Sequence, residues 1–179
     1  SAYQPLVHAQ GGRWIAYIGL HGGQQPNALS GKSEPNGTAI LDVTEPRQPK
    51  LLAHIPGAPG ALDFLSDVSG TTVVFTRIEG AKQSIWSFNT TTSGPAIELA
   101  PSPTSLRRGA SIGGNTVAWQ ELGFSTGTSV ISEVMAYDLA TGTAVRITED
   151  AQIDRDMSVA PGGNVIAWDK CTTSSSPCD

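Results

Sequence analysis

The residues of this sequence that can transfer protons or ligate a metal are few and far apart. The histidines are His8, His21 and His54, and no two of them have the i, i+2 or i, i+4 spacing of a local metal site. We therefore expect ordinary structural or surface roles for them. His21 is also kept as a candidate binding residue, because the two glycines after it leave room for a ligand to approach.

Basic residues offer a second chemistry, the binding of anions. Arg107 and Arg108 form the only adjacent basic pair, and a guanidinium can hold a carboxylate or phosphate through two parallel hydrogen bonds. Gly31-Lys32-Ser33 has the ending of a phosphate-binding loop, but Pro26 stands where that loop needs a glycine and has no N–H to offer. We expect a surface loop there, and we count Lys32 only as a candidate binding residue.

Acidic residues gather in two short stretches, Glu149-Asp150 and Asp154-Arg155-Asp156. A calcium loop alternates its carboxylates around a glycine bend, and neither stretch does so. We expect these carboxylates to cap turns and to pair with Arg155. No Gly-x-Ser-x-Gly nucleophile motif occurs, so the sequence predicts no catalytic residue, no metal site and no cofactor.

Two cysteines, Cys171 and Cys178, are separated by six residues that are mostly serine and threonine. A disulfide between them would close a small ring and indicate an oxidising compartment. Two free thiols are the alternative, whereas a metal site needs four ligands and no histidine is near. We expect the disulfide.

The composition limits the class of protein. The chain of 179 residues has a formal net charge of −5, and only 15% of its residues are charged. Such a chain is not expected to bind nucleic acid or an anionic membrane, and no apolar run approaches the roughly 18 residues of a membrane-spanning helix. Twenty glycines and twelve prolines indicate many short strands joined by tight turns.

The candidate residues must be positioned by a framework that repeats along the chain. A branched apolar residue, a glycine turn and an apolar strand ending in an aromatic residue occur three times, with the aromatic residues 44 and 49 positions apart. The copies are Val68–Phe75, Ile112–Trp119 and Val159–Trp168. This placement predicts that Trp86, Trp119 and Trp168 lie in the core and leaves Trp14 as the tryptophan most open to a binding role.

Each period contains four strand-like segments, which is the pattern of a β-propeller blade. We predict an all-β fold, a β-propeller or partial propeller of about three and a half four-stranded blades. The expected blades are residues 1–60, with a long loop at 20–37, then 61–106, 107–152 and a half blade at 153–179. A blade's first strand borders the central channel, so Arg107 and Arg108 either bind an anion there or pair with acidic residues of neighbouring blades.

The number of blades has a consequence for assembly. A propeller commonly closes a ring of about 4–8 blades, and three and a half blades would leave two apolar faces in water. We therefore expect a fragment of a longer protein, or else self-association or a partner chain that completes the ring. A four-bladed ring with one reduced blade is the third interpretation.

Residues 61–179 resemble the TolB-type family of WD40-like propeller repeats in bacterial envelope proteins. The resemblance rests on Ile85-Trp86 with Phe88-Asn89, on Tyr137-Asp138-Leu-Ala-Thr-Gly142, and on Val159-Ala-Pro-Gly-Gly163, which lacks the aspartate of the family pattern Ser-Pro-Asp-Gly. Residues 1–60 are similar instead to LVIVD-repeat proteins, through 37–46 and 49–56. Both likenesses imply an extracytoplasmic propeller (periplasmic, secreted or at the cell surface) with binding loops, and neither transfers a catalytic residue.

We therefore expect a non-catalytic binding or scaffold propeller. Loops at 20–37 and 122–130 on one face would contact a protein or a glycan, with these candidate binding residues: His21, Lys32, Arg107, Arg108 and Trp14. One alternative is a lyase or hydrolase acting on a polysaccharide, with His21 and Arg107 or Arg108 at the channel mouth. Another is a structural subunit of an extracellular assembly, since open blade edges can associate.

Overall fold

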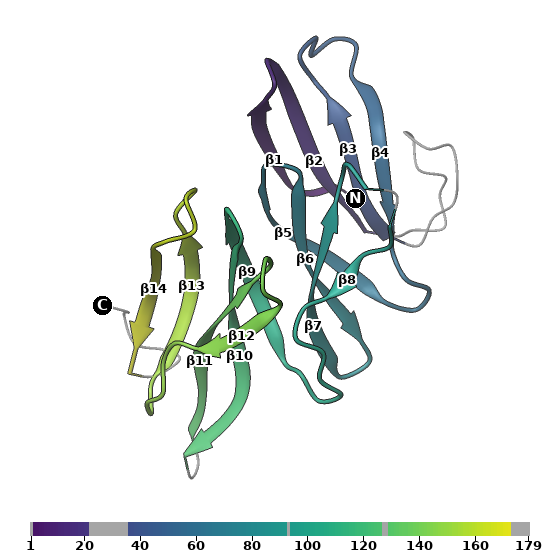
Figure 1. The fold of residues 1–179 in the computed structure, drawn as a ribbon. Coiled ribbons are helices and arrows are strands. Elements are labelled where there is room, and N and C mark those ends of the chain that lie inside the picture. The colour runs from purple at the N-terminus through teal and green to yellow at the C-terminus, as the bar shows by residue number, and fades with distance from the viewer. Residues whose placement is uncertain (1, 22–35, 93, 127–128, 173–179) are drawn as a thin grey trace.

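The described part of the chain consists of β-strands and their connections. The structure, a computed structural model, describes residues 2–21, 36–92, 94–126 and 129–172. They form fourteen strands in three antiparallel sheets, the last of which is extended by a further pair of strands (Figure 1). None of the described residues belongs to a helix that could cross a membrane.

The first sheet contains four strands in chain order: β1 (Ala2–Gln10), β2 (Arg13–His21), β3 (Asn36–Asp42) and β4 (Lys50–Pro56). Side chains alternate between its two faces, as the period of a strand requires. Ile15 and Tyr17 pack against the second sheet, whereas Ala16 belongs to a separate cluster on the opposite face.

The second sheet contains β5 (Leu62–Ser69), β6 (Thr72–Glu79), β7 (Lys82–Asn89) and the short β8 (Ile97–Glu98). Its second strand is buried on both faces, since consecutive residues from Val73 to Phe75 are at most 1% exposed. Val73 joins the cluster shared with the first sheet and Val74 joins the cluster shared with the third. This sheet is therefore a blade with a neighbour on each side.

The third sheet contains β9 (Arg107–Gly113), β10 (Thr116–Thr126), β11 (Ser129–Asp138) and β12 (Thr143–Arg146). A further antiparallel pair, β13 (Ile153–Val159) and β14 (Ile166–Cys171), meets β11 at one parallel bridge between Ser132 and Ile153. A Cβ on Gly113 would lie 1.9 Å from the carbonyl oxygen of Ala160, so only glycine allows the end of β9 to approach the end of β13 so closely.

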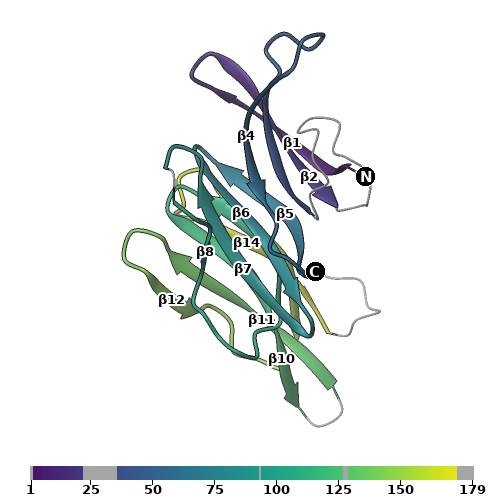
Figure 2. The ribbon, with the colours of Figure 1, turned by 90° about the vertical axis from the view of Figure 1, so that its right-hand side faces the viewer.

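The sheets stack face to face around the first strand of each. Apolar side chains of neighbouring sheets interlock in three shared clusters, one for each junction along the chain. Figure 1 shows the sheets fanned in chain order, and Figure 2 shows the second and third overlapping when viewed from the side. The arrangement is an arc of blades, as the repeat predicts.

Hydrogen bonds also join the inner strands of successive blades. The Asp67 carboxylate accepts from Ser111 Oγ and from the Ile112 amide, each at 2.9 Å. Ser111 Oγ in turn accepts from the Val159 amide at 3.1 Å. These bonds link β5, β9 and β13 at the spacing of the repeat, so Asp67 holds neighbouring blades together.

The expectation that Arg107 pairs with an acidic residue of a neighbouring blade is wrong. Asp63 pairs with Arg77 and Arg107 pairs with Glu121, in both cases across two adjacent strands of one sheet. Antiparallel pairing places these residues directly opposite each other, within closer reach than any residue of the next blade.

The predicted core tryptophans differ in burial. Trp119 is fully buried, as predicted, while Trp86 and Trp168 are only half-buried. Trp168 lies on β14, an edge strand of a two-stranded unit, and therefore has less structure around it. Trp14 is 54% exposed, in agreement with its expected openness.

The cysteine prediction can be tested directly. Cys171 ends β14 and is 1% exposed, whereas Cys178 lies outside the described residues. If the two are bridged, non-reducing peptide mapping should recover a linked species lighter than the dithiol by two hydrogen atoms. Alkylation of both thiols without prior reduction would contradict the prediction.

Candidate binding site

An irregularity recurs at the same place in three inner strands. The pairing register shifts at Ser66 in β5, at residues 109–110 in β9 and at residues 156–157 in β13. Each shift places extra residues of the inner strand near the repeat aromatic of the next strand. Such bulges turn side chains and backbone groups away from the regular ladder.

The bulges line a cavity of about 610 Å³. Its wall comes from β5 (residues 64–66), β9 (residues 108–110) and β13 (Asp156 and Met157), with three residues contributed by β6 and β7. The volume lies within the range of about 300–1,000 Å³ typical of ligand pockets. The repeat therefore builds a concave surface where the blades meet.

Among the described residues, the charged side chains at this wall are Arg108 and Asp156. Arg108 is exposed, and its Nε donates to Gln120 Oε1 at 3.1 Å. Asp156 is exposed, has a φ of 55° and lies 3.5 Å from the Arg155 guanidinium. Aspartate tolerates this left-handed conformation better than most residues.

Arg107 has a different environment from its neighbour. Its Nε donates to Glu121 at 2.6 Å, and Nη1 donates to the carbonyl oxygens of Leu99 and Ala100 at 2.9 and 2.6 Å. The guanidinium also lies 5.2 Å from the centroid of the Trp119 ring. Groups of the protein therefore already bind the Arg107 guanidinium, and the residue is only 6% exposed.

None of the other sequence candidates is among the described residues of the cavity wall. His21 is the last residue of β2, where its backbone pairs with Asn36, and its side chain is not among those described. Lys32 lies outside the described residues. Trp14 belongs to the first sheet, which contributes nothing to the cavity wall.

The expected binding loop at 122–130 is largely strand. β10 continues to Thr126 and β11 begins at Ser129, so residues 122–126 and 129–130 extend one hairpin. The Phe124 ring on this hairpin lies 4.4 Å from the Arg146 guanidinium. The loop at 20–37 falls mostly outside the described residues.

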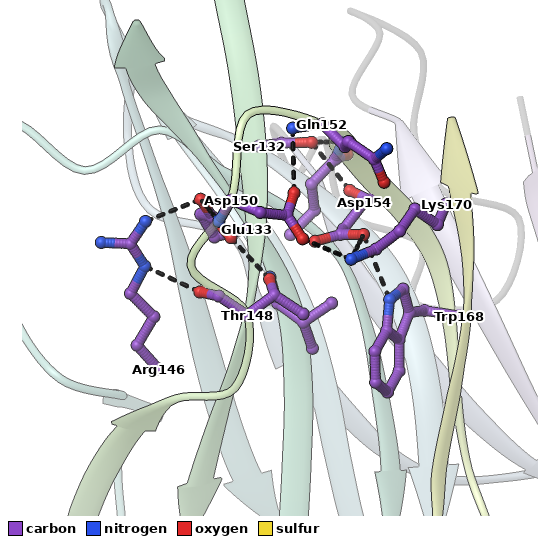
Figure 3. A network of polar contacts seen from close by, with 11 residues as sticks. Ser132, Glu133, Arg146, Thr148, Asp150, Gln152, Asp154, Trp168 and Lys170 are labelled. Carbon is purple, nitrogen blue, oxygen red and sulfur yellow. Dashed lines mark hydrogen bonds and ion pairs between the residues drawn. The ribbon is translucent and has the colours of Figure 1, made fainter. Parts of the chain in front are cut away.

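The acidic stretches of the sequence form a network beside β11 and β14 (Figure 3). Glu133 is fully buried and accepts from Arg146 Nη2 and Thr148 Oγ1, each at 2.6 Å, and from the Asp150 amide at 3.2 Å. Lys170 binds Asp150 and lies 3.9 Å from Asp154. Within the described ranges, no three acidic, histidine or cysteine residues are arranged to hold a metal ion.

The Asp150–Lys170 pair should make stability depend on pH at both extremes. The hydrogen bond from Lys170 lowers the pKa of Asp150, and the same bond raises the pKa of Lys170. Stabilisation from Asp150 is therefore present above its unfolded pKa and is lost as pH falls through the lowered value. Stabilisation from Lys170 is present below its unfolded pKa and is lost as pH rises through the raised value.

Urea unfolding of Asp150→Asn at several pH values checks this expectation. Both side chains are more than a third exposed, so solvent screening should limit the loss at neutral pH to about 1 kcal/mol or less. The difference from the unmodified chain should shrink below the lowered pKa of Asp150. A loss of equal size at every pH would contradict the pairing.

Sequence reasoning missed the residues that support Arg108. Gln120 is 7% exposed and donates through Nε2 to Ser132 Oγ at 2.8 Å, and Ser132 donates to the Asp154 carbonyl at 2.7 Å. The sequence pattern could have indicated Gln120, because it directly follows the repeat aromatic Trp119, as Thr76 follows Phe75. In a strand the residue after a core aromatic points to the other face.

Comparison with known proteins tests the fold. No protein-family profile matches the sequence, and no curated protein sequence matches it either. A solved structure assigned to TolB of Agrobacterium tumefaciens matches 91% of this chain with a TM-score of 0.58 and 15% identity. The chain has a β-propeller fold.

The match also shows how much of a propeller this chain represents. The chain spans about half, 52%, of the length of the Agrobacterium structure. Weaker likenesses are to TolB of Acinetobacter baumannii, with a TM-score of 0.47, 15% identity and coverage of 96% and 50% of the two chains. An endo-arabinase of Bacteroides thetaiotaomicron gives a TM-score of 0.49, 14% identity and coverage of 98% and 72%.

Proposed function

We propose that this chain is a non-catalytic, extracytoplasmic binding propeller whose inner-strand cavity receives a segment of a partner protein. The observation that carries the proposal is the cavity itself, a pocket of about 610 Å³ with an exposed Arg108 and an exposed Asp156 at its wall. The expected disulfide and the TolB-type resemblance support the extracytoplasmic location.

The charged groups of the cavity favour binding over catalysis. Arginine stays protonated in proteins and cannot act as a general base. Asp156 is the one carboxylate among the described residues of the wall, and its neighbour is the Arg155 guanidinium rather than a second acid. The fully buried Glu133 and Asp154 lie away from the wall and hold strands together.

The lining favours a peptide over a sugar. Apolar side chains make up part of the wall, namely Phe64, Leu65, Ile78, Ala110 and Met157, and polar side chains such as Ser66, Thr76 and Gln83 stand among them. Bulged residues also leave backbone N–H and C=O groups outside the ladder, where an extended peptide can pair with them.

A cavity-blocking variant tests the proposal. Ser66→Phe should fill the cavity and abolish binding of a fluorescent hexapeptide library, measured by fluorescence anisotropy. Ser158→Phe is the matched control, because Ser158 is exposed on β13 but does not line the cavity. Equal binding by Ser66→Phe and the control would show that the cavity is not the site, and preferential binding of oligosaccharides would replace the peptide.

A second proposal, completion of the ring by association, is favoured by one face of the first sheet. Val7, Ala16, Leu41 and Leu51 form a row across its four strands on the face turned away from the second sheet. Val7 and Leu51 on the outer strands are 52% and 41% exposed and Trp14 is 54% exposed, whereas Ala16 and Leu41 between them are buried. Apolar faces of this kind normally mark an interaction site.

The native mass distinguishes the routes to a closed ring. Self-association predicts a native mass that rises with concentration above the 18.6 kDa of one chain. Trp14→Lys should return it to that of one chain, because it places a charge in the apolar face. A monomer at all concentrations would contradict self-association.

A further inference from the structure

The guanidinium of Arg108 is held by one hydrogen bond within the protein, and the side chain is otherwise exposed. Its Nε donates to Gln120 Oε1 at 3.1 Å, whereas the two terminal nitrogens have no protein partner among the described residues. Arg107 differs from it in both respects, since that side chain is buried and its donors reach Glu121 and two backbone carbonyls. Arg107 therefore binds groups within the protein, whereas Arg108 has donors that a ligand can use.

The group behind Arg108 is a buried relay of hydrogen bonds. Gln120 donates to Ser132 Oγ at 2.8 Å, and Ser132 donates to the carbonyl oxygen of Asp154 at 2.7 Å. Gln120 is 7% exposed and Ser132 is 1% exposed, so their orientations are set by the packing of β10, β11 and β13. A guanidinium positioned in this way loses less side-chain entropy when it binds a ligand.

We infer that Arg108 is a clamp for the carboxylate of an acidic peptide, and that Gln120 and Ser132 are positioning residues for it. The inference rests on the proposed binding of a peptide in the cavity. Two terminal nitrogens presented in parallel match the two oxygens of a carboxylate, the pair that arginine binds most specifically.

The second charge of the cavity decides between anions. Asp156 faces the same space as Arg108, so the described wall carries one positive and one negative group. Asp156 would repel a phosphate with two negative charges more strongly than a carboxylate with one. An N–H group next to that carboxylate can donate to Asp156. A peptide supplies such a backbone N–H at every residue except proline.

Fluorescent hexapeptides test the clamp. One library carries a single aspartate and a free C-terminus, and a matched library carries asparagine and a C-terminal amide. The full 179-residue chain should bind the acidic library about ten- to a hundredfold more tightly, the factor expected for hydrogen bonds between charged groups. Arg108→Gln should remove this preference, while Arg47→Gln, which changes the charge of the chain equally at an exposed turn, should keep it.

Two nearly isosteric variants test the positioning role. Ser132→Val removes the hydroxyl that joins Gln120 to the Asp154 carbonyl, and Ser132→Thr keeps it. The acidic preference should fall in the valine variant and persist in the threonine variant. A merely structural role would change thermal stability in both variants without changing this ratio, and would overturn the positioning assignment.

The outcomes separate this inference from the proposed function. Peptide binding that is blocked by Ser66→Phe but indifferent to Arg108→Gln would overturn the clamp and leave the binding site intact. Peptide binding that survives both Ser66→Phe and Arg108→Gln would overturn the clamp and the proposed binding site together. Tighter binding of a phosphoserine hexapeptide or of oligogalacturonate than of the acidic library would overturn the assigned ligand class.

Discussion

Replacement of Arg77 by alanine is expected to lower the free energy of unfolding by about 3–5 kcal/mol. Arg77 donates to both carboxylate oxygens of Asp63, at 2.7 and 2.8 Å, and the two side chains are 9% and 4% exposed. Alanine would leave the Asp63 carboxylate buried without its partner. The loss then includes the desolvation of that charge as well as the missing attraction.

The surroundings of Arg77 increase the expected loss. Its guanidinium lies 4.3 Å from the Trp86 ring centroid and 5.5 Å from that of Phe75, so the truncation also removes packing on two aromatic rings. The hydrogen bond to Asp63 raises the pKa of Arg77, which keeps the arginine charged throughout the pH range of any unfolding experiment.

Urea unfolding at neutral pH provides the measurement. Arg13→Ala is the control, because Arg13 is 60% exposed and solvent screens its 3.6 Å contact with Asp42, so the loss should be small. The double variant Asp63→Leu with Arg77→Met should cost less than Arg77→Ala alone, since it leaves no unpaired charge. Equal losses for Arg77→Ala and Arg13→Ala would refute the buried pair.

Trp119→Ala should also cost about 3–5 kcal/mol. The indole is fully buried at the junction of the second and third sheets, where it shares a cluster with Val74, Ile85 and Leu99 of the preceding blade. Its Nε1 donates to Glu121 Oε2 at 2.9 Å. Alanine would open a cavity between two blades and leave that carboxylate with one partner fewer.

Two further tryptophan variants calibrate this expectation. Trp14→Ala removes a side chain that is 54% exposed and should change stability by less than about 1 kcal/mol. Trp119→Phe keeps most of the volume but loses the hydrogen bond, and should fall between the two. A near-neutral Trp119→Ala would be incompatible with the alignment of the repeats.

The repeat made the framework predictable from sequence. Phe75, Trp119 and Trp168 are 44 and 49 residues apart, and each lies on the second strand of its unit. Every blade must bury its faces against neighbouring blades in the same way, so the same pattern of apolar and turn residues recurs in each blade. The blade expected at residues 1–60 is likewise a sheet of four strands, β1 to β4.

The cavity was less accessible to sequence reasoning. Its wall depends on bulges at Ser66, Gly109 and Asp156, and a bulge is a relation between two strands that neither strand shows alone. The relay from Arg108 through Gln120 to Ser132 joins residues on three different strands. Its members have no common spacing in the chain.

The all-β class, the four-stranded repeat and the burial of Trp119 could be predicted from the sequence, since these follow from local alternation and from a period along one chain. The sequence also singled out the pair Arg107 and Arg108, but it treated the two as equivalent. Only the tertiary structure separated them: one guanidinium is enclosed by Glu121 and backbone carbonyls, and the other faces a cavity. The reason is physical, because neighbours on a strand point to opposite faces and a bulge re-aims them, so their surroundings are set by other blades.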